Sequence, residues 1–291
     1  MPLRRSRRQI GLVILGGALM LATPASCSAV DVSVVVQAGA RLDGEELQPL
    51  LNADIVYLGE HHDRPADHAA QLEIIEALYA EHPDMAIALE MFQQPFQSVI
   101  DQYLAGELSE AELVEQSEYE QRWGFPWEYY APMLRFAKAN QIPVLALNAP
   151  SEVVRQVAQS GLTGLSENDF RYIPPLSDID TTNRDYQAFV REAFGSHGSH
   201  GDFNFDNFFA AQVVWDETMA EAIANFKQTS PDTLVVVLAG TGHVIYGYGI
   251  PDRVDRRLEG SVDQTKVLLN MPSDALPNPA DGVADVLWYS E

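Results

Sequence analysis

Three apolar segments of the chain share one pattern, in which a short hydrophobic run ends in acidic or imidazole side chains. They are Ile55–Leu58, Met85–Leu89 and Leu234–Ala239. Apolar runs of this length are typical of buried strands. The carboxyl ends of parallel strands lie at one edge of a sheet, where loops converge on a ligand-binding crevice. We therefore expect the polar residues that follow these strands to meet at one site.

Amphipathic segments alternate with the strands and have the spacing or the end signals of helices. The expected helices span residues 65–82, 95–105, 109–116, 127–140, 151–159 and 203–228, and further strands span 32–37, 143–147, 266–271 and 283–289. Ser109 and Glu112 have the spacing of a capping box. The alternation predicts an α/β fold with a mainly parallel central sheet and helices on both faces.

Residues 160–202 differ from the rest, because Pro174, Pro175 and several glycines interrupt them. We interpret this region as a small helical cap. The chain has 291 residues, which fits one large α/β domain, and its polar strand ends are scattered over most of that length. We therefore expect a single domain over residues 28–291.

The first 27 residues have the features of an export signal. Four arginines between Arg4 and Arg8 precede an apolar run, Ile10–Ala22, that is too short for an ordinary transmembrane helix. The general secretory route and the twin-arginine route both fit this pattern. Cys27 follows the run as in a bacterial lipoprotein signal, although Pro24 departs from that motif. We expect an exported protein, either periplasmic or anchored to a membrane by a lipid on Cys27.

Composition narrows the classes of partner and ligand. The formal net charge is −24, which repels phosphate backbones and argues against nucleic acid as a partner. The chain has one cysteine, so disulfides within the chain and thiolate metal sites are excluded. Any metal ligands must therefore be nitrogen and oxygen donors.

Four side chains that follow the strands are expected to meet at the sheet edge, namely Glu60, His62, Glu90 and His243. Two carboxylates and two imidazoles can hold a divalent metal such as zinc, or can act directly as acid and base on water. Adjacent histidines at a strand end point in opposite directions. A turn at Gly59 leaves undecided whether His61 or His62 faces the site.

Each of these residues also has an ordinary structural explanation. The histidine that faces away caps the next helix or lies in solvent. Glu90 ends a very apolar strand and needs a cation, a metal or hydrogen-bond donors, and Arg135 or Arg155 would supply a salt bridge. The gathering of acids and imidazoles on separate strand ends favours a functional site.

Two further segments carry candidate binding residues. Gly240 and Gly242 bring the backbone close to neighbouring groups, and N–H groups at the start of a helix suit a carboxylate. Gln212 and Asp216 lie four residues apart on one face of an expected helix. That face is either an exposed polar stripe or the place from which Asp216 orients a histidine.

Five aromatic residues lie within the eight residues from Trp123 to Tyr130. Most aromatic clusters belong to a core, but tyrosine can ligate haem iron and a flat apolar wall suits a porphyrin. Tyr129 and Tyr130 are therefore candidate ligands. His197 and His200 lie in a loop rich in Gly and Ser, where exposure to solvent is the simpler interpretation and a mobile ligand is the other.

Several motifs, taken in order, resemble those of the ChaN-like haem-binding lipoproteins. This family looks like a branch of the wider group of Tiki metalloproteases, TraB proteins and erythromycin esterases, which two Gly-x-x-His motifs and strand-end glutamates mark. The motifs cover roughly residues 45–260. They are Gly59-Glu60-His61-His62-Asp63, Leu89-Glu90-Met91-Phe92, Leu147-Asn148-Ala149-Pro150, the segment Ala211–Ala220, Ala239-Gly240-Thr241-Gly242-His243-Val244 and Gly249-Ile250-Pro251.

The resemblance implies haem binding linked to iron acquisition, with a tyrosine as an iron ligand and a homodimer around the haem as one arrangement. The residues expected to contact the haem are His61, Tyr129, Tyr130, Asp216, Gly240 and Gly242. The alternative is a metal-dependent esterase or peptidase of the wider group, in which Glu60, His62, Glu90 and His243 bind the metal and act on water. A scaffold protein with a relic site is a third hypothesis. We favour the binding protein.

Overall fold

The computed structural model describes residues 34–37, 47–196, 204–269 and 282–289. The chain divides into two units after residue 30, and all described residues belong to the second unit. The predicted signal segment with Cys27, and the loop histidines His197 and His200, lie outside the described residues. Within those ranges, no helix is long and apolar enough to cross a bilayer.

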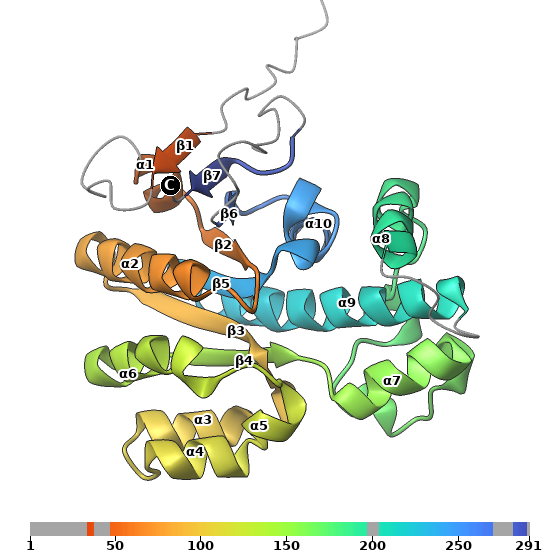
Figure 1. Cartoon of the computed structure of the whole chain (residues 1–291), viewed down its shortest axis with the longest axis horizontal. Coiled ribbons are helices and arrows are strands. Elements are labelled where there is room, and N and C mark those ends of the chain that lie inside the picture. Colours follow the sequence, from red (N-terminus) through yellow and green to blue (C-terminus); the bar gives the residue numbers. More distant parts are fainter. Residues whose placement is uncertain (1–33, 38–46, 197–203, 270–281, 290–291) are drawn as a thin grey trace, which may run out of the picture. The chain divides into compact units, whose positions relative to one another are not determined.

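The described residues contain a seven-stranded sheet in the order β1-β7-β6-β2-β5-β3-β4 (Figure 1). Its strands are β1 (Val34–Gln37), β2 (Ile55–Glu60), β3 (Met85–Gln93), β4 (Val144–Asn148), β5 (Leu234–Gly240), β6 (Gln264–Leu268) and β7 (Val286–Tyr289). Every strand pair is parallel. The prediction of an α/β fold with a parallel central sheet is confirmed.

The α-helices of the described residues lie on both faces of the sheet (Figure 1). They are α1 (Gln48–Leu51), α2 (Pro65–Glu81), α3 (Gln97–Leu104), α4 (Glu110–Gln116), α5 (Tyr119–Arg122), α6 (Ala131–Asn140), α7 (Ser151–Ser160), α8 (Arg184–Ser196), α9 (Phe205–Thr229) and α10 (Ile250–Arg257). Short 3-10 helices are η1 (Gln94–Phe96), η2 (Trp127–Tyr129), η3 (Leu162–Gly164), η4 (Asp169–Arg171), η5 (Leu176–Asp178), η6 (Thr241–His243) and η7 (Ile245–Gly247).

The three central strands β2, β3 and β5 are buried along their whole length. Alternate side chains of a strand point to opposite faces of the sheet. Val56 and Leu58 of β2 therefore belong to a core with α2 and α6. Ile55 and Tyr57 belong to a second core with α9 and α10. Because both faces are covered, these strands consist almost entirely of apolar residues, as the sequence indicated.

The amino-terminal half of α9 extends beyond the strand ends, where α7 and α8 pack beside it (Figure 1). Val157 of α7, Tyr186 of α8 and Phe209 of α9 belong to a third hydrophobic cluster. Because α7 directly follows β4, this cluster adjoins the edge at which the parallel strands end. The region beside that edge therefore has an apolar support.

Most of the expected elements form, and the differences lie at their ends. The capping box of Ser109 and Glu112 is present at the start of α4. β3 continues to Gln93, beyond the predicted end at Leu89, and α10 was not predicted. Residues 162–178 form η3, η4 and η5, and α8 follows. That this region acts as a cap, within a single domain over residues 28–291, stays a prediction.

Candidate functional site

Glu60, His62, Glu90 and His243 lie next to one another at the carboxyl edge of the sheet. Glu60 ends β2 and is the direct partner of Gly240, which ends β5. The backbone N–H of Gly240 donates to Glu90 Oε2 at 2.7 Å. Glu90 Oε1 lies 3.4 Å from His243 Nε2. The parallel register of neighbouring strands thus joins groups that lie 150 and more residues apart in sequence.

The Glu60 carboxylate is buried and receives hydrogen bonds from both sides. His62 Nδ1 lies 2.7 Å from Oε1, which also accepts the hydroxyl of Tyr130 at 2.5 Å. Gln71 Nε2 donates to Oε2 at 2.5 Å, and His68 Nδ1 lies 3.6 Å from the same oxygen. Glu60 therefore fixes the orientation of His62, and α2 and the loop before α6 hold Glu60 itself.

The two adjacent histidines have different surroundings, which settles the question that the sequence left open. His62 turns into the site, where its ring lies 4.8 Å from that of Trp123 and 5.1 Å from that of Phe125. His61 instead turns to Asp67 in the first turn of α2, with its backbone N–H 2.7 Å and its Nδ1 3.1 Å from Asp67 Oδ2. His61 thus has the structural role that was one of the two interpretations.

Asp216 orients His243, as the helical spacing of Gln212 and Asp216 predicted. His243 Nδ1 lies 2.6 Å from Asp216 Oδ1 and 3.1 Å from Gln212 Nε2. The Tyr186 hydroxyl of α8 donates to Asp216 Oδ2 at 2.7 Å. The polar face of α9 is therefore directed at the sheet edge and not at solvent.

The pKa values of Glu90, His243 and His62 are set by neighbouring opposite charges, which outweigh the effect of burial. Burial alone would raise the pKa of Glu90, but the charges of His243 and His62 and the bond from Gly240 lower it to about 2. Burial alone would lower the pKa of His243, but Glu90 and Asp216 raise it to about 10. The pKa of His62 is likewise raised, against burial, by its bond to Glu60. At neutral pH Glu90 is therefore an ionised carboxylate paired with a protonated His243.

This pairing explains why the expected metal site is not supported. Among the described residues, no group of three or more His, Cys, Asp or Glu is arranged to hold a metal ion. The carboxylates of Glu60 and Glu90 point at histidines and N–H or O–H donors, so their lone pairs do not converge on a common point. The zinc alternative and the metal-dependent hydrolase that depends on it are therefore not favoured.

The structure also shows which cation lies beside Glu90 and which groups lie close to Gly240 and Gly242. Arg135 pairs with Glu110 and Glu128, and the cation beside Glu90 is His243. A Cβ at Gly240 would lie 2.8 Å from His62 Nε2, so a side chain there would displace the imidazole. The Gly240 N–H binds the carboxylate of Glu90, and a Cβ at Gly242 would meet nothing within 4 Å. The carboxylate that was expected at the backbone N–H of Gly240 is thus the side chain of Glu90.

The two tyrosines proposed from composition lie beside Glu60. Tyr130 is fully buried, and its hydroxyl is the one that binds Glu60. Tyr129 is partly buried and stacks on His68, with ring centroids 4.7 Å apart. Burial raises the pKa of Tyr130 well above its usual value, so its phenol stays protonated. Their role as iron ligands stays a prediction.

Sequence reasoning missed His68, Gln71 and Tyr186. The first two lie on the buried face of α2, with Ile75 and Leu78 further along the same face. Extending that apolar stripe toward the start of the helix reaches Gln71 and His68, which are polar residues at core positions. This is a detectable signal of a buried polar network. Tyr186 lies in the expected cap region and had no comparable signal.

Comparisons with known proteins agree with the motifs. The profile of a family described as haem-binding uptake, Tiki superfamily, ChaN matches residues 47–254. Protein RETICULATA-RELATED 5, chloroplastic, of Arabidopsis thaliana is 30% identical over 261 residues, which cover 84% of this chain and 35% of that protein. The chain thus spans about a third of the length of this curated relative.

Solved structures share the fold. ChaN of Campylobacter jejuni, whose structure shows cofacial haem binding, superposes with a TM-score of 0.65 and 20% identity, over 82% of this chain and 89% of that chain. The type III effector HopBA1 superposes with a TM-score of 0.52 and 12% identity, over 90% of this chain and 99% of that chain. At these identities the two likenesses concern the fold alone.

Proposed function

Because the chain belongs to the haem-binding uptake (ChaN) family of the Tiki superfamily, we propose that it is an exported haem-binding protein linked to the uptake of iron or haem. The resemblance inferred from the sequence motifs is confirmed by this membership. Haem binding and export rest on separate observations and are tested by separate experiments.

The observation that supports haem binding is the aromatic surround of the charged sheet edge. Trp123 and Phe125 pack against His62, whose side chain keeps 25% of its surface exposed. On the other side, the Trp215 ring lies edge-on to His243 at 5.8 Å. Flat apolar side chains beside accessible imidazole fit a porphyrin, whose macrocycle is apolar and whose iron takes nitrogen or oxygen ligands.

The family resemblance assigns the iron ligand to a tyrosine, and Tyr129 and Tyr130 are the candidates in this chain. Tyr129 is the more accessible of the two, because Tyr130 is fully buried and engaged with Glu60. Bound haem would supply an iron centre with an open coordination position. The residues of the chain would supply the ligand, the apolar walls and the exclusion of water.

Export and attachment to a membrane are supported by the sequence alone. The arginines before the apolar run and the position of Cys27 indicate a lipoprotein signal, and the proposal places the protein in the periplasm or on a membrane. A lipid on Cys27 would hold the haem-binding domain at a membrane surface, where haem in transit is accessible. A homodimer around the haem is the further arrangement that we propose.

An absorption spectrum tests haem binding. The protein is purified from haem-supplied cells, and hemin is then titrated into the apoprotein. We expect a Soret band that saturates with added hemin, and size-exclusion chromatography with and without hemin reports any dimer. Absence of the band in both preparations would contradict the proposed function.

Fractionation tests the export proposal. The wild-type chain, Cys27→Ser and the matched control Ser28→Ala are expressed with a labelled fatty acid. We expect label and membrane attachment for the wild type and the control, and neither for Cys27→Ser. Retention of all three in the cytoplasm would overturn the proposal of export while leaving haem binding to be judged by the spectrum.

A further inference from the structure

Trp123 and Phe125, which we call the aromatic wall, pack against His62 at 4.8 Å and 5.1 Å between ring centroids. Both lie in the connection between α4 and α6. The described backbone hydrogen bonds of this connection are local, such as the one from the Trp123 N–H to the Tyr119 carbonyl. Backbone pairing with the sheet therefore does not hold the wall in place, and side chains must do so.

Arg122 ends α5, directly before the wall, and its guanidinium group contacts two other elements. Nη1 donates to Gln93 Oε1 at the end of β3, at 2.8 Å. The same nitrogen lies 3.3 Å from Ser151 Oγ and 3.1 Å from Glu152 Oε2, at the start of α7. The guanidinium also lies over the Phe96 ring, 5.0 Å from its centroid. Only 20% of the Arg122 side chain is exposed, so these contacts are largely shielded from water.

Arg122 also holds the turn from which α5 starts. Its Nε and Nη2 each lie 2.7 Å from Glu118 Oε2. Glu118 has a left-handed backbone with a φ of 52°, which is uncommon for a residue other than glycine and needs support from its surroundings. Gly124, within the wall, has a φ of 85°. Because a left-handed residue lies on each side of α5, no continuous helix sets its direction, and the contacts of Arg122 do.

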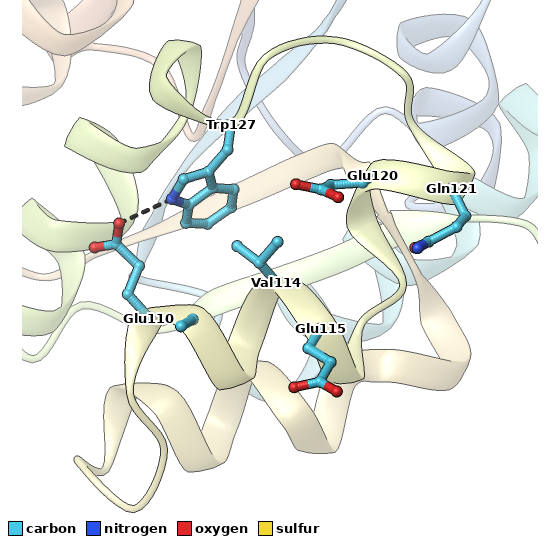
Figure 2. A pocket seen from close by; sticks show the side chains of 7 residues that line it. Glu110, Val114, Glu115, Glu120, Gln121 and Trp127 are labelled. Atoms are coloured by element: carbon cyan, nitrogen blue, oxygen red, sulfur yellow. Dashed lines mark hydrogen bonds between the residues drawn. The ribbon is translucent and has the colours of Figure 1, made fainter.

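Other contacts hold the parts of the connection on either side of the wall. Tyr119, at the start of α5, is buried and packs edge-on against Trp127 at 5.0 Å between ring centroids. Trp127 Nε1 donates to Glu110 Oε1 of α4 at 2.9 Å (Figure 2). These contacts fix the start of α5 and the residues after the wall, and they leave its carboxyl end to Arg122.

Packing alone does not fix α5, because a pocket of about 500 Å³ lies between α4, α5 and Trp127. Figure 2 shows Glu120 and Gln121 of α5 at this pocket, opposite α4. A short helix with open space beside it can change its direction without a clash. The polar contacts of Arg122 with β3 and α7 are therefore what keeps the wall at His62.

We propose that Arg122 is a positioning residue of the haem site, which holds the aromatic wall against His62 before haem binds. The proposal rests on the proposed function, in which this wall contacts the porphyrin. It assigns no contact between Arg122 and haem, and it leaves the iron to the candidate ligands Tyr129 and Tyr130. A wall that is already in place binds more tightly, because ordering side chains during binding lowers the affinity.

The test compares variants of Arg122 on the full chain with and without the aromatic wall. Arg122→Gln removes the charge, and Arg122→Lys keeps the charge but loses the planar group that reaches several acceptors. The double variant Trp123→Leu/Phe125→Leu removes the wall. The matched control is Arg155→Gln, which removes the same charge from an exposed residue of α7. Circular dichroism and Tm confirm folding of each variant before the measurements.

The first measurement uses the apoprotein and needs no haem. The ring resonances of His62 in NMR spectra report the wall, because two aromatic rings lie close to the imidazole. We expect Arg122→Gln to move these resonances toward their positions in the variant without the wall. Arg122→Lys should give intermediate positions, and Arg155→Gln should leave them unchanged. His62 resonances that are the same in Arg122→Gln and the wild type would overturn the proposal.

The second measurement is hemin titration. Arg122→Gln should weaken hemin binding by about tenfold, which is the loss that one charge-assisted hydrogen bond accounts for. In the variant without the wall the same substitution should have no further effect, since a positioning residue acts only through the group that it positions. An equal loss with and without the wall, or in Arg155→Gln, would overturn the proposal, because Arg122 would then act through its charge or through overall stability.

The outcomes separate this inference from the function on which it rests. A wild-type chain without a Soret band overturns haem binding and with it the role of Arg122 in a haem site. A wild-type chain that binds hemin as tightly as Arg122→Gln does overturns the positioning role and leaves haem binding intact. If the variant without the wall does not fold, the His62 resonances of Arg122→Gln, Arg122→Lys and Arg155→Gln decide the question, because these variants keep both aromatic residues.

Discussion

His243 Nδ1 lies 2.6 Å from Asp216 Oδ1, and this contact joins the end of β5 to the middle of α9. Both side chains are buried, Asp216 completely. Asp216→Asn removes the carboxylate and leaves an imidazole next to an amide. We expect the pKa of His243 to fall from about 10 toward its ordinary value, and the free energy of unfolding to fall by about 3 kcal/mol, as for other broken buried pairs. NMR titration of His243 and urea unfolding measure the two effects, with the exposed Asp206→Asn on the same helix as the control.

The same pair, with Glu90, sets the pH range in which the site stabilises the fold. The pKa of His243 is raised in the folded state, so its contribution is complete below its unfolded pKa of about 6.5 and is lost as the pH rises through about 10. The pKa of Glu90 is lowered, so its contribution is complete above about 4.5 and is lost as the pH falls through about 2. Unfolding free energies measured across this range should show a maximum between these limits. A stability that increases as the pH approaches 10 would contradict the assignment of His243.

Gly240 allows His62 to approach the end of β5. In Gly240→Ala the new methyl group would lie 2.8 Å from His62 Nε2 and 2.9 Å from Cε1, closer than carbon contacts allow. We expect His62 to be displaced and the free energy of unfolding to fall by about 1–3 kcal/mol, as in other overpacked positions. Gly242→Ala, where a methyl group meets nothing within 4 Å, is the matched control. Equal stability of the two variants, with an unchanged His62 resonance, would show that His62 does not lie against this strand.

Tyr130 and Tyr129 are adjacent in sequence but differ in what their hydroxyl groups do. Tyr130→Phe removes the O–H that donates to the buried Glu60 at 2.5 Å. A hydrogen bond to a charged group contributes about 1.5–3 kcal/mol, so we expect a loss of this size in urea unfolding. Tyr129→Phe leaves the hydrogen bonds of the Glu60 carboxylate in place and should leave stability nearly unchanged. The haem spectra of both variants test the prediction that one of these tyrosines ligates iron, since loss of a phenolate ligand shifts the Soret and charge-transfer bands.

The sheet and its polar edge could be predicted because each apolar strand and the polar residues at its end are consecutive in the sequence. The apolar run before Glu60 and the run before Gly240 each indicate a buried strand, and parallel pairing then brings their ends together. Asp216 could be predicted to face inward from its helical spacing to Gln212. These inferences need only the periodicity of strands and helices, not the detailed directions of side chains.

The directions of side chains could not be predicted, and the alternative of a metal site is not supported for that reason. Sequence counts potential ligands, but metal binding requires their lone pairs to converge. In the structure Glu60 is turned to His62 and Tyr130, and Glu90 to Gly240 and His243. The end of β3 was also missed, because β3 and β4 change register between Leu89 and Gln93, which no local pattern indicated.

Glu217 is a second buried carboxylate of α9, and it gives the last prediction. It is fully buried, and Arg257 Nη1 lies 2.5 Å and Arg256 Nη2 2.7 Å from its Oε2, while Arg253 Nε lies 3.3 Å from its Oε1. Glu217→Gln would leave three arginines of α10 without their common anion. Because the penalty of an uncompensated buried charge is large, we expect the free energy of unfolding to fall by about 3 kcal/mol.

Glu221, one turn further along α9, is the matched control. Its pKa is raised by burial, so its ionised form is already disfavoured in the folded state. Glu221→Gln should therefore leave the stability unchanged or raise it slightly, although it makes the same chemical change on the same helix. If both variants lost the same stability, charge removal from α9 in general, and not the anchoring of α10, would be the cause. Urea unfolding of the two proteins under identical conditions distinguishes these cases.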